Sequence, residues 1–152
     1  IDEGLVGSEM CIRDSYNTDA WDGYPKDREK FYKAINNSQS NLVLAGDSHN
    51  SWISNLFDKE KNFKGIEIGA PSITSPNFID TFGQFTDAID KSSIESNKDL
   101  VWTDGKNKGY VELEIYSDYV DVKFKYVSSV KSKNYTNLEP ISFRIDHQKV
   151  LT

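Results

Sequence analysis

Hydrophobic and polar positions follow a helical period in some segments of the chain and a strand period in others. Apolar and charged residues each recur at a spacing of four over residues 27–37, which predicts a short helix with one apolar and one ion-paired face. The apolar run of residues 41–45, closed by Gly46, predicts a buried strand. A helix followed by a buried strand is typical of an α/β fold.

The same patterns continue downstream. Residues 65–70 alternate and predict a second strand, and the apolar run of residues 100–103 predicts a third. Apolar residues at spacings of three and four predict a helix over residues 78–89, although Gly83 interrupts it. Alternation over residues 141–145 predicts a last strand.

The sharpest pattern is a β-hairpin, with strands at residues 110–116 and 119–127. A two-residue loop of Ser117 and Asp118 fixes the register, with Glu112 opposite Lys123 on the solvated face. We expect the other face to be buried, because it carries three apolar pairs: Ile115 with Val120, Leu113 with Val122, and Val111 with Phe124.

Composition narrows the class of protein. Of the 152 residues, 37% are hydrophobic and 28% are charged, and no long apolar run is present, so the sequence predicts a globular protein without a transmembrane segment. The formal net charge is −6. Without a basic cluster, a nucleic-acid surface is not expected, because phosphate binding needs concentrated Lys and Arg.

Residues 1–15 differ from the rest. They contain the only Cys and the only Met, follow neither structural period, and resemble translated sequencing-adaptor read-through. We interpret them as a non-native or disordered segment, and residues 16–152 as the domain proper. Because that remainder has no methionine, we expect it to be the C-terminal portion of a longer protein.

Candidate chemistry follows the first predicted strand. Asp47 and His49 stand two residues apart after Gly46, at the carboxyl edge of a sheet, where α/β sites gather. A carboxylate suits hard cations and an imidazole suits iron or zinc, so the pair could serve two adjacent metals. A turn with local hydrogen bonds explains the same residues, and spacing alone does not separate the two interpretations.

Four segments resemble the alkaline phosphatase D family of calcineurin-like metallophosphoesterases. They agree with the family in order and spacing, and are WDGYPKDRE, LVLAGDSHNSW, IEIGAPSITSPNF and NKGYVELEI. Lys108 stands where the family pattern has Arg. The resemblance implies an αββα sandwich, to whose C-terminal part this chain contributes mostly strands of one sheet and a terminal hairpin.

The resemblance also implies hydrolysis of phosphomonoesters and phosphodiesters, including small-molecule and lipid-headgroup esters, at a dinuclear or trinuclear centre of iron and calcium. Asp47 would bind the calcium-type position and His49 the iron. The earlier ligand motifs of the family precede this segment, so the N-terminal half of the same protein would supply them. The resemblance further implies an extracellular or periplasmic location.

Two more residues are candidates. Arg28 could bind a phosphate oxygen through its planar fork, although a solvated helix position explains it too. Glu67 is a candidate for orienting His49 as a partner of that ligand, without binding the metal itself. We expect the loop that follows Glu67 to lie near the site as a rim. His147 is expected to be an exposed residue of the C-terminal tail.

Two other classes of function are alternative interpretations of the same sequence. Gly46-Asp47-Ser48 resembles the nucleophile block of GDS-type serine esterases, in which Ser48 would attack an acyl carbon. Those enzymes need Asp three residues before a C-terminal His, whereas here Asp146 is adjacent to His147. A non-catalytic β-sandwich binding module would explain the hairpin, but not the helix and strand that precede it.

Overall fold

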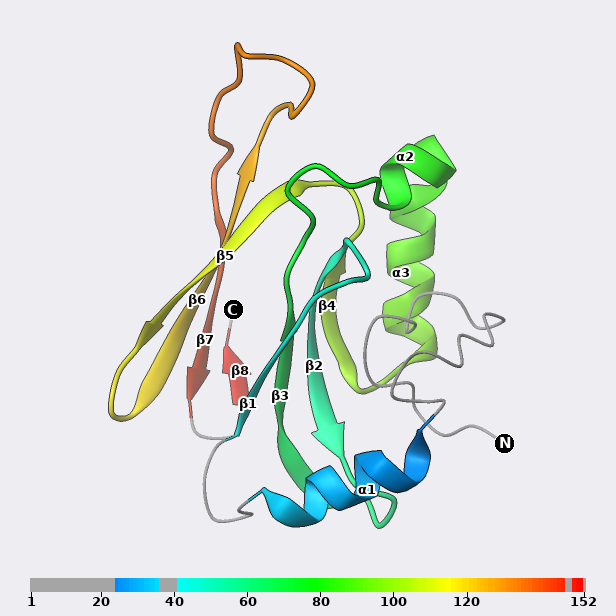
Figure 1. The fold of residues 1–152 in the computed structure, drawn as a ribbon, viewed down its shortest axis with the longest axis vertical. Helices are drawn as coiled ribbons and strands as arrows, with labels where there is room; N and C mark the ends of the chain where they lie inside the picture. Colours follow the sequence, from blue (N-terminus) through cyan, green and yellow to red (C-terminus); the bar gives the residue numbers. More distant parts are fainter. Residues whose placement is uncertain (1–23, 36–40, 147–148, 152) are drawn as a thin grey trace.

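The structure of the protein is a computed structural model. It contains two four-stranded sheets (Figure 1). The structure describes residues 24–35, 41–146 and 149–151. The first sheet has the order β1-β3-β2-β4, formed by β1 (Leu42–Ala45), β2 (Ser51–Phe57), β3 (Phe63–Gly69) and β4 (Leu100–Asp104). The second has the order β5-β6-β7-β8, formed by β5 (Lys108–Ile115), β6 (Tyr119–Val127), β7 (Ile141–Asp146) and β8 (Lys149–Leu151).

The first sheet is mixed and the second is antiparallel. β1 runs parallel to β3, and β2 runs antiparallel to both β3 and β4. Every pair in the second sheet is antiparallel. The expected α/β class is confirmed, and the strands divide between two sheets of four rather than lying mostly in one.

The helices begin and end where local chemistry dictates. α1 (Pro25–Ala34) starts with proline in its first turn, where the missing N–H costs nothing. The single helix expected over residues 78–89 is instead α2 (Phe78–Phe82), a 3₁₀ turn (Gly83–Phe85) and α3 (Thr86–Ser96). Gly83 breaks the helix because it adopts φ +54°, which closes α2. α3 packs beside β4 (Figure 1).

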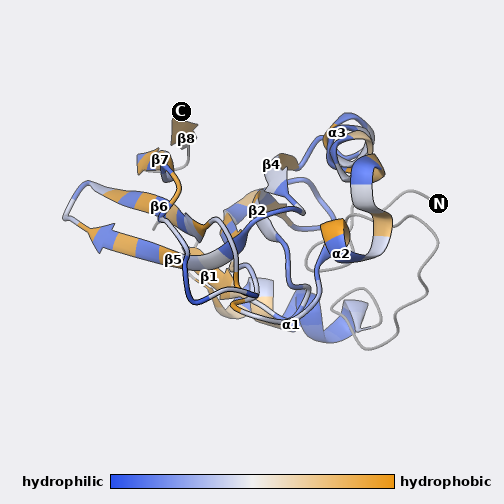
Figure 2. Cartoon of the chain, turned by 90° about the horizontal axis from the view of Figure 1, so that it is seen from above, coloured by the Kyte–Doolittle hydropathy of each residue, from blue (hydrophilic) through white to orange (hydrophobic). Residues whose placement is uncertain are grey.

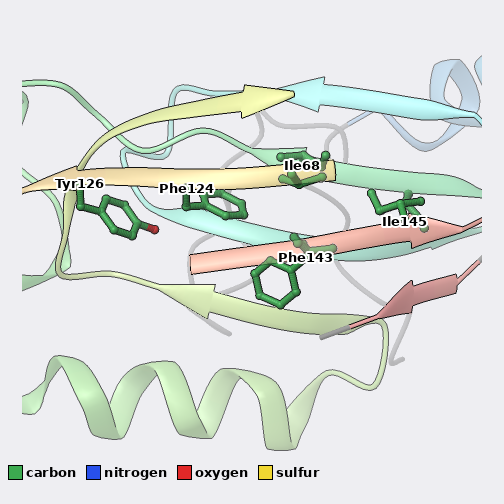
Figure 3. Close-up of a cluster of buried hydrophobic side chains, with 8 residues drawn as sticks. Ile68, Phe124, Tyr126, Phe143 and Ile145 are labelled. Atoms are coloured by element: carbon green, nitrogen blue, oxygen red, sulfur yellow. The ribbon is translucent and has the colours of Figure 1, made fainter. Parts of the chain in front are cut away.

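The core lies between the two sheets. Ile53, Ile66 and Ile68 of the first sheet are buried against side chains of the second, which are Val122, Phe124, Tyr126, Phe143 and Ile145. Trp102 of β4 packs against the rings of Phe124 and Phe143, at centroid distances of 4.6 and 5.1 Å. Figure 3 shows this cluster between the strands. Burial of these apolar groups is the main force that joins the sheets.

The hairpin of β5 and β6 has the register that the sequence predicts. Ile115 pairs with Val120, and the register continues without a shift to Lys108 and Val127. Hydrophobic and hydrophilic residues alternate along both strands (Figure 2). The burial of this face ends before the loop of the hairpin, because Ile115 beside the loop is 72% exposed. Glu112 lies opposite Lys123 as predicted, but the ion pairs run diagonally, from Lys125 to Glu112 and from Lys123 to Glu114.

Two features of the first sheet differ from expectation. β2 has no counterpart among the predicted strands, although it lies inside the sheet between β3 and β4. The run of residues 41–45 does form a strand, but β1 is an edge strand of the described sheet and Leu44 is 64% exposed. The expectation that this strand is buried is therefore wrong, because none of its four residues is buried.

Among the described residues, none of the helices has the length and hydrophobicity of a membrane span. Residues 1–15 lie outside the described residues, so their interpretation as a non-native segment stays a prediction.

Candidate functional site

The candidate residues lie where two neighbouring strands end. β1 and β3 pair in parallel, with Ala45 opposite Gly69, so their carboxyl ends meet at one edge of the sheet. Residues 46–50 follow β1 and lead into β2, and residues 70–77 follow β3 and lead into α2. The Ala70 N–H donates to the Ala45 carbonyl at 2.9 Å. Ligands of α/β proteins bind at edges of this kind.

The turn of residues 46–50 has an unusual backbone. The Ser48 N–H donates to the Gly46 carbonyl at 2.9 Å, and Asp47 between them has φ +71°. This arrangement is a γ-turn of the rare, strained form. His49 is also left-handed, with φ +65°. Asp and His tolerate this region better than most residues, yet strain of this kind is concentrated at functional sites.

A main-chain group orients the imidazole of His49. Its Nδ1 lies 2.7 Å from the carbonyl oxygen of Pro76. Because a carbonyl can only accept, Nδ1 carries a proton and donates it. The lone pair of the neutral ring is then on Nε2, which is the form that binds metal ions.

The loop of residues 71–77 and the first residue of α2 form further hydrogen bonds to the turn. The Ser72 N–H donates to the His49 carbonyl at 3.2 Å, and the Phe78 N–H donates to Asn50 Oδ1 at 3.3 Å. Asn50 is buried. Within the loop, the Ser72 hydroxyl donates to the Ser75 carbonyl at 2.7 Å. The loop therefore lies beside His49, as the sequence predicts.

The donor groups of the turn suit a metal ion. Asp47 is exposed and His49 partly exposed, and they offer carboxylate oxygens and an imidazole nitrogen, ligands for hard and borderline metals respectively. In the described ranges, no group of three or more His, Cys, Asp or Glu side chains converges as a metal site would require. Since two groups alone bind a metal weakly, these residues fit part of a larger centre.

Glu67 lies inside the first sheet. It is a buried residue of β3, opposite Val43 of β1 and Ser54 of β2. The hydrogen bond that the structure shows at His49 Nδ1 goes to the Pro76 carbonyl. A role for Glu67 in orienting His49 stays a prediction.

Arg28 lies on α1, away from the turn. Figure 1 shows α1 at the opposite end of β2 from residues 46–50. Arg28 therefore does not share the strand edge that carries Asp47 and His49, and its binding of phosphate stays a prediction. His147 lies outside the described residues.

Sequence reasoning missed Pro76 and Asn50. Pro76 acts through its carbonyl oxygen, a group that every residue has, so no side-chain pattern could indicate it. Asn50 directly follows the Asp-x-His pattern, and its position there was the available signal.

Comparison with known proteins gives consistent matches. The family model described as PhoD-like phosphatase matches residues 5–124. Alkaline phosphatase D of Bacillus subtilis (strain 168) is 46% identical over 66 residues, which are 40% of this chain and 11% of that protein. A solved structure described as "Structure of PhoD" is 25% identical, with a TM-score of 0.66, and the match covers 88% of this chain and 26% of the solved one. The chain thus spans a minor part of the relatives it matches.

Proposed function

The chain belongs to the PhoD-like phosphatase family, and from this premise we propose that the intact protein is a metal-dependent hydrolase of phosphoric esters. This chain would contribute two metal ligands, Asp47 and His49. Its relatives in the comparisons are named as phosphatases.

One observation carries the proposal. The Pro76 carbonyl accepts from Nδ1 of His49 at 2.7 Å and leaves Nε2 available as a ligand. The partner belongs to the loop after β3, whereas His49 follows β1. Two separate segments therefore fix the tautomer and direction of one imidazole, as in protein metal sites.

The residues of the turn have separable roles. His49 would hold its metal through Nε2, and the exposed Asp47 carboxylate would bind a harder cation. Bound metal ions would supply Lewis acidity, which lowers the pKa of water and neutralises phosphoryl oxygens. The left-handed backbone at both residues orients the turn before any ligand arrives.

The finer assignments follow from the family resemblance. We propose iron at the His49 position and calcium at the Asp47 position. Proposed substrates are phosphomonoesters and phosphodiesters, both small-molecule and lipid-headgroup, and the proposed location is extracellular or periplasmic. The remaining ligands would come from the N-terminal half of the same protein.

A serine esterase is the second candidate, and the geometry at Ser48 disfavours it. The Ser48 hydroxyl oxygen is buried and has no hydrogen-bond partner among the described residues. A serine nucleophile needs a base within about 3.2 Å and an exposed oxygen.

Metal analysis and hydrolysis assays on the intact protein test the proposal. We expect His49→Gln and Asp47→Asn each to lower the metal content and to reduce phosphatase turnover by about 100-fold or more, because each removes a ligand bond. Ser48→Ala is the matched control within the same turn and should retain most activity. Chelators should abolish turnover, and added metal should restore it.

The opposite pattern would overturn the proposal. A serine nucleophile would give an inactive Ser48→Ala variant and an enzyme insensitive to chelators, because a covalent acyl mechanism needs no cation. Hydrolysis of carboxylic esters, assayed in parallel, distinguishes that outcome from simple loss of folding.

A further inference from the structure

The loop that orients His49 is itself anchored from the second sheet. The amino end of β5 contacts residues 72–77 at several points. The Gly109 N–H donates to the Ser72 carbonyl at 3.1 Å, and the Asn77 side-chain amide donates to the Asn107 carbonyl at 3.4 Å. The loop therefore lies between the start of β5 and the turn of residues 46–50.

Lys108 makes the charged contact in this anchor. Its ammonium donates to the Ser75 carbonyl and to Oδ2 of Asp80, the latter at 2.6 Å. The Lys108 side chain is 11% exposed and that of Asp80 is 26% exposed. Asp80 Oδ2 also accepts from the Asn77 N–H at 3.2 Å. The Lys108 ammonium therefore binds the loop at Ser75, and the Asp80 carboxylate binds it at Asn77.

The peptide group held by Lys108 is adjacent to the one that orients His49. The Ser75 carbonyl is followed directly by Pro76, whose carbonyl accepts from His49 Nδ1. Proline has no N–H, so this segment has one fewer main-chain donor for the hydrogen bonds that hold it in place. The Lys108 ammonium, with the Asn77 N–H, lowers the pKa of Asp80, which keeps the carboxylate charged for this contact.

We infer that Lys108 is a positioning residue for His49, acting through the Ser75-Pro76 segment. The inference rests on the proposed function, because it assigns Lys108 a role in preparing a metal ligand. This role requires no contact of Lys108 with the metal or the substrate. Lys108 binds the Ser75 carbonyl and so holds the next peptide group, that of Pro76, whose carbonyl selects the Nδ1-protonated form of His49.

The test compares matched lysine variants of the intact protein. Lys108→Met removes the ammonium, and Lys108→Arg keeps two donors for Ser75 and Asp80. Lys125→Met is the control, because it breaks a similar ion pair with Glu112 (2.7 Å) in the same sheet, without contact to the loop. Affinity for Co²⁺ alone, followed by its visible absorption, is the first measurement. The ¹⁵N spectrum of the His49 imidazole in the metal-free protein, assigned by its loss in His49→Gln, is the second.

We expect Lys108→Met to lower Co²⁺ affinity by about 10-fold to 100-fold, the usual effect of losing support behind a ligand. The His49 signals should shift towards the Nε2-protonated form. Lys108→Arg should retain both properties to within about 3-fold, and Lys125→Met should change neither. If Lys108→Met does not fold, Asp80→Asn, which removes the other half of the pair, should change both measurements in the same direction.

Other outcomes overturn the inference. Unchanged affinity and tautomer in Lys108→Met, or equal losses in Lys108→Arg or Lys125→Met, would show that the lysine has no specific positioning role. The effect of His49→Gln separates this failure from that of the proposed function. If His49→Gln leaves Co²⁺ affinity unchanged, His49 is not a ligand and the proposed function fails. If His49→Gln lowers affinity and Lys108→Met does not, only the positioning role is wrong.

Discussion

The phenol hydroxyl of Tyr126 in β6 donates a hydrogen bond of 2.8 Å to the hydroxyl of Ser51 in β2. Both residues are buried, at 2% and 0% exposure, so this polar contact lies within the apolar interface between the sheets. Figure 3 shows the Tyr126 ring beside Phe124 in that interface. Ser51 directly follows the turn that carries His49, so the contact links the second sheet to the start of β2.

Tyr126→Phe should destabilise the protein by about 1–3 kcal/mol, because it leaves the buried Ser51 oxygen without its donor. Guanidinium unfolding followed by circular dichroism measures the change. The double variant Tyr126→Phe/Ser51→Ala removes both partners and should recover part of the loss. If the loss of unfolding free energy in the double variant exceeds the sum of the losses in the two single variants, this account of the contact is contradicted.

Stability should fall at alkaline pH because of Tyr126. Burial, reinforced by the nearby Asp104 carboxylate, raises the pKa of the Tyr126 phenol above its ordinary value of 10.0. Above pH 10 the unfolded chain loses this proton while the folded chain keeps it, so the unfolding free energy should decrease by about 1.4 kcal/mol per pH unit from this group. Below pH 10 the Tyr126 phenol is protonated in both states, so its contribution to the unfolding free energy is fully present. Unfolding curves at pH 9 and 11 should show a smaller drop in Tyr126→Phe than in the wild type, and equal drops would refute the assignment.

Asp47→Gly should stabilise the metal-free protein by about 0.5–1 kcal/mol, because glycine adopts positive φ without steric cost. Asp47→Ala is the control: it also removes the carboxylate but keeps the Cβ, and should bring no such gain. The comparison of unfolding midpoints isolates the backbone strain from the loss of the ligand. Equal stability of the two variants would show that the γ-turn stores no strain at Asp47.

Gly69→Ala should displace Trp52 and lower stability by about 1–3 kcal/mol. A Cβ at Gly69 would overlap the Trp52 indole, which is buried against it. Tryptophan fluorescence should shift to longer wavelength as the indole gains water. Gly46→Ala is the control, since nothing lies within 4 Å of its added Cβ. If Gly69→Ala matches Gly46→Ala in both measurements, the close packing of Trp52 on Gly69 is not a constraint.

Sequence alone determined the features that depend on neighbours in the chain. The register of the β5 and β6 hairpin followed from the two-residue loop and the alternation on either side, because a short turn fixes which residues face each other. The strand end at Ala45 followed from an apolar run closed by glycine. The same local reasoning placed Asp47 and His49 in a turn at the carboxyl edge of a sheet.

Only the tertiary structure revealed β2. Four consecutive residues, Ser51 to Ser54, are buried, and the strand has neighbouring strands on both edges. Ser51 and Ser54 interrupt the apolar pattern that would indicate a strand. Their polar groups are tolerated inside because partners exist there, as the Tyr126 bond to Ser51 shows.

The orientation of His49 also needed the tertiary structure. The Asp-x-His pattern is visible in the sequence, but the atom that selects its tautomer is the main-chain carbonyl of Pro76, 27 residues away. The parallel pairing of β1 with β3 brings that carbonyl to His49. A carbonyl oxygen is present at every residue, so only the path of the chain decides which one a side chain meets, and the path is set by long-range packing that local sequence patterns do not encode.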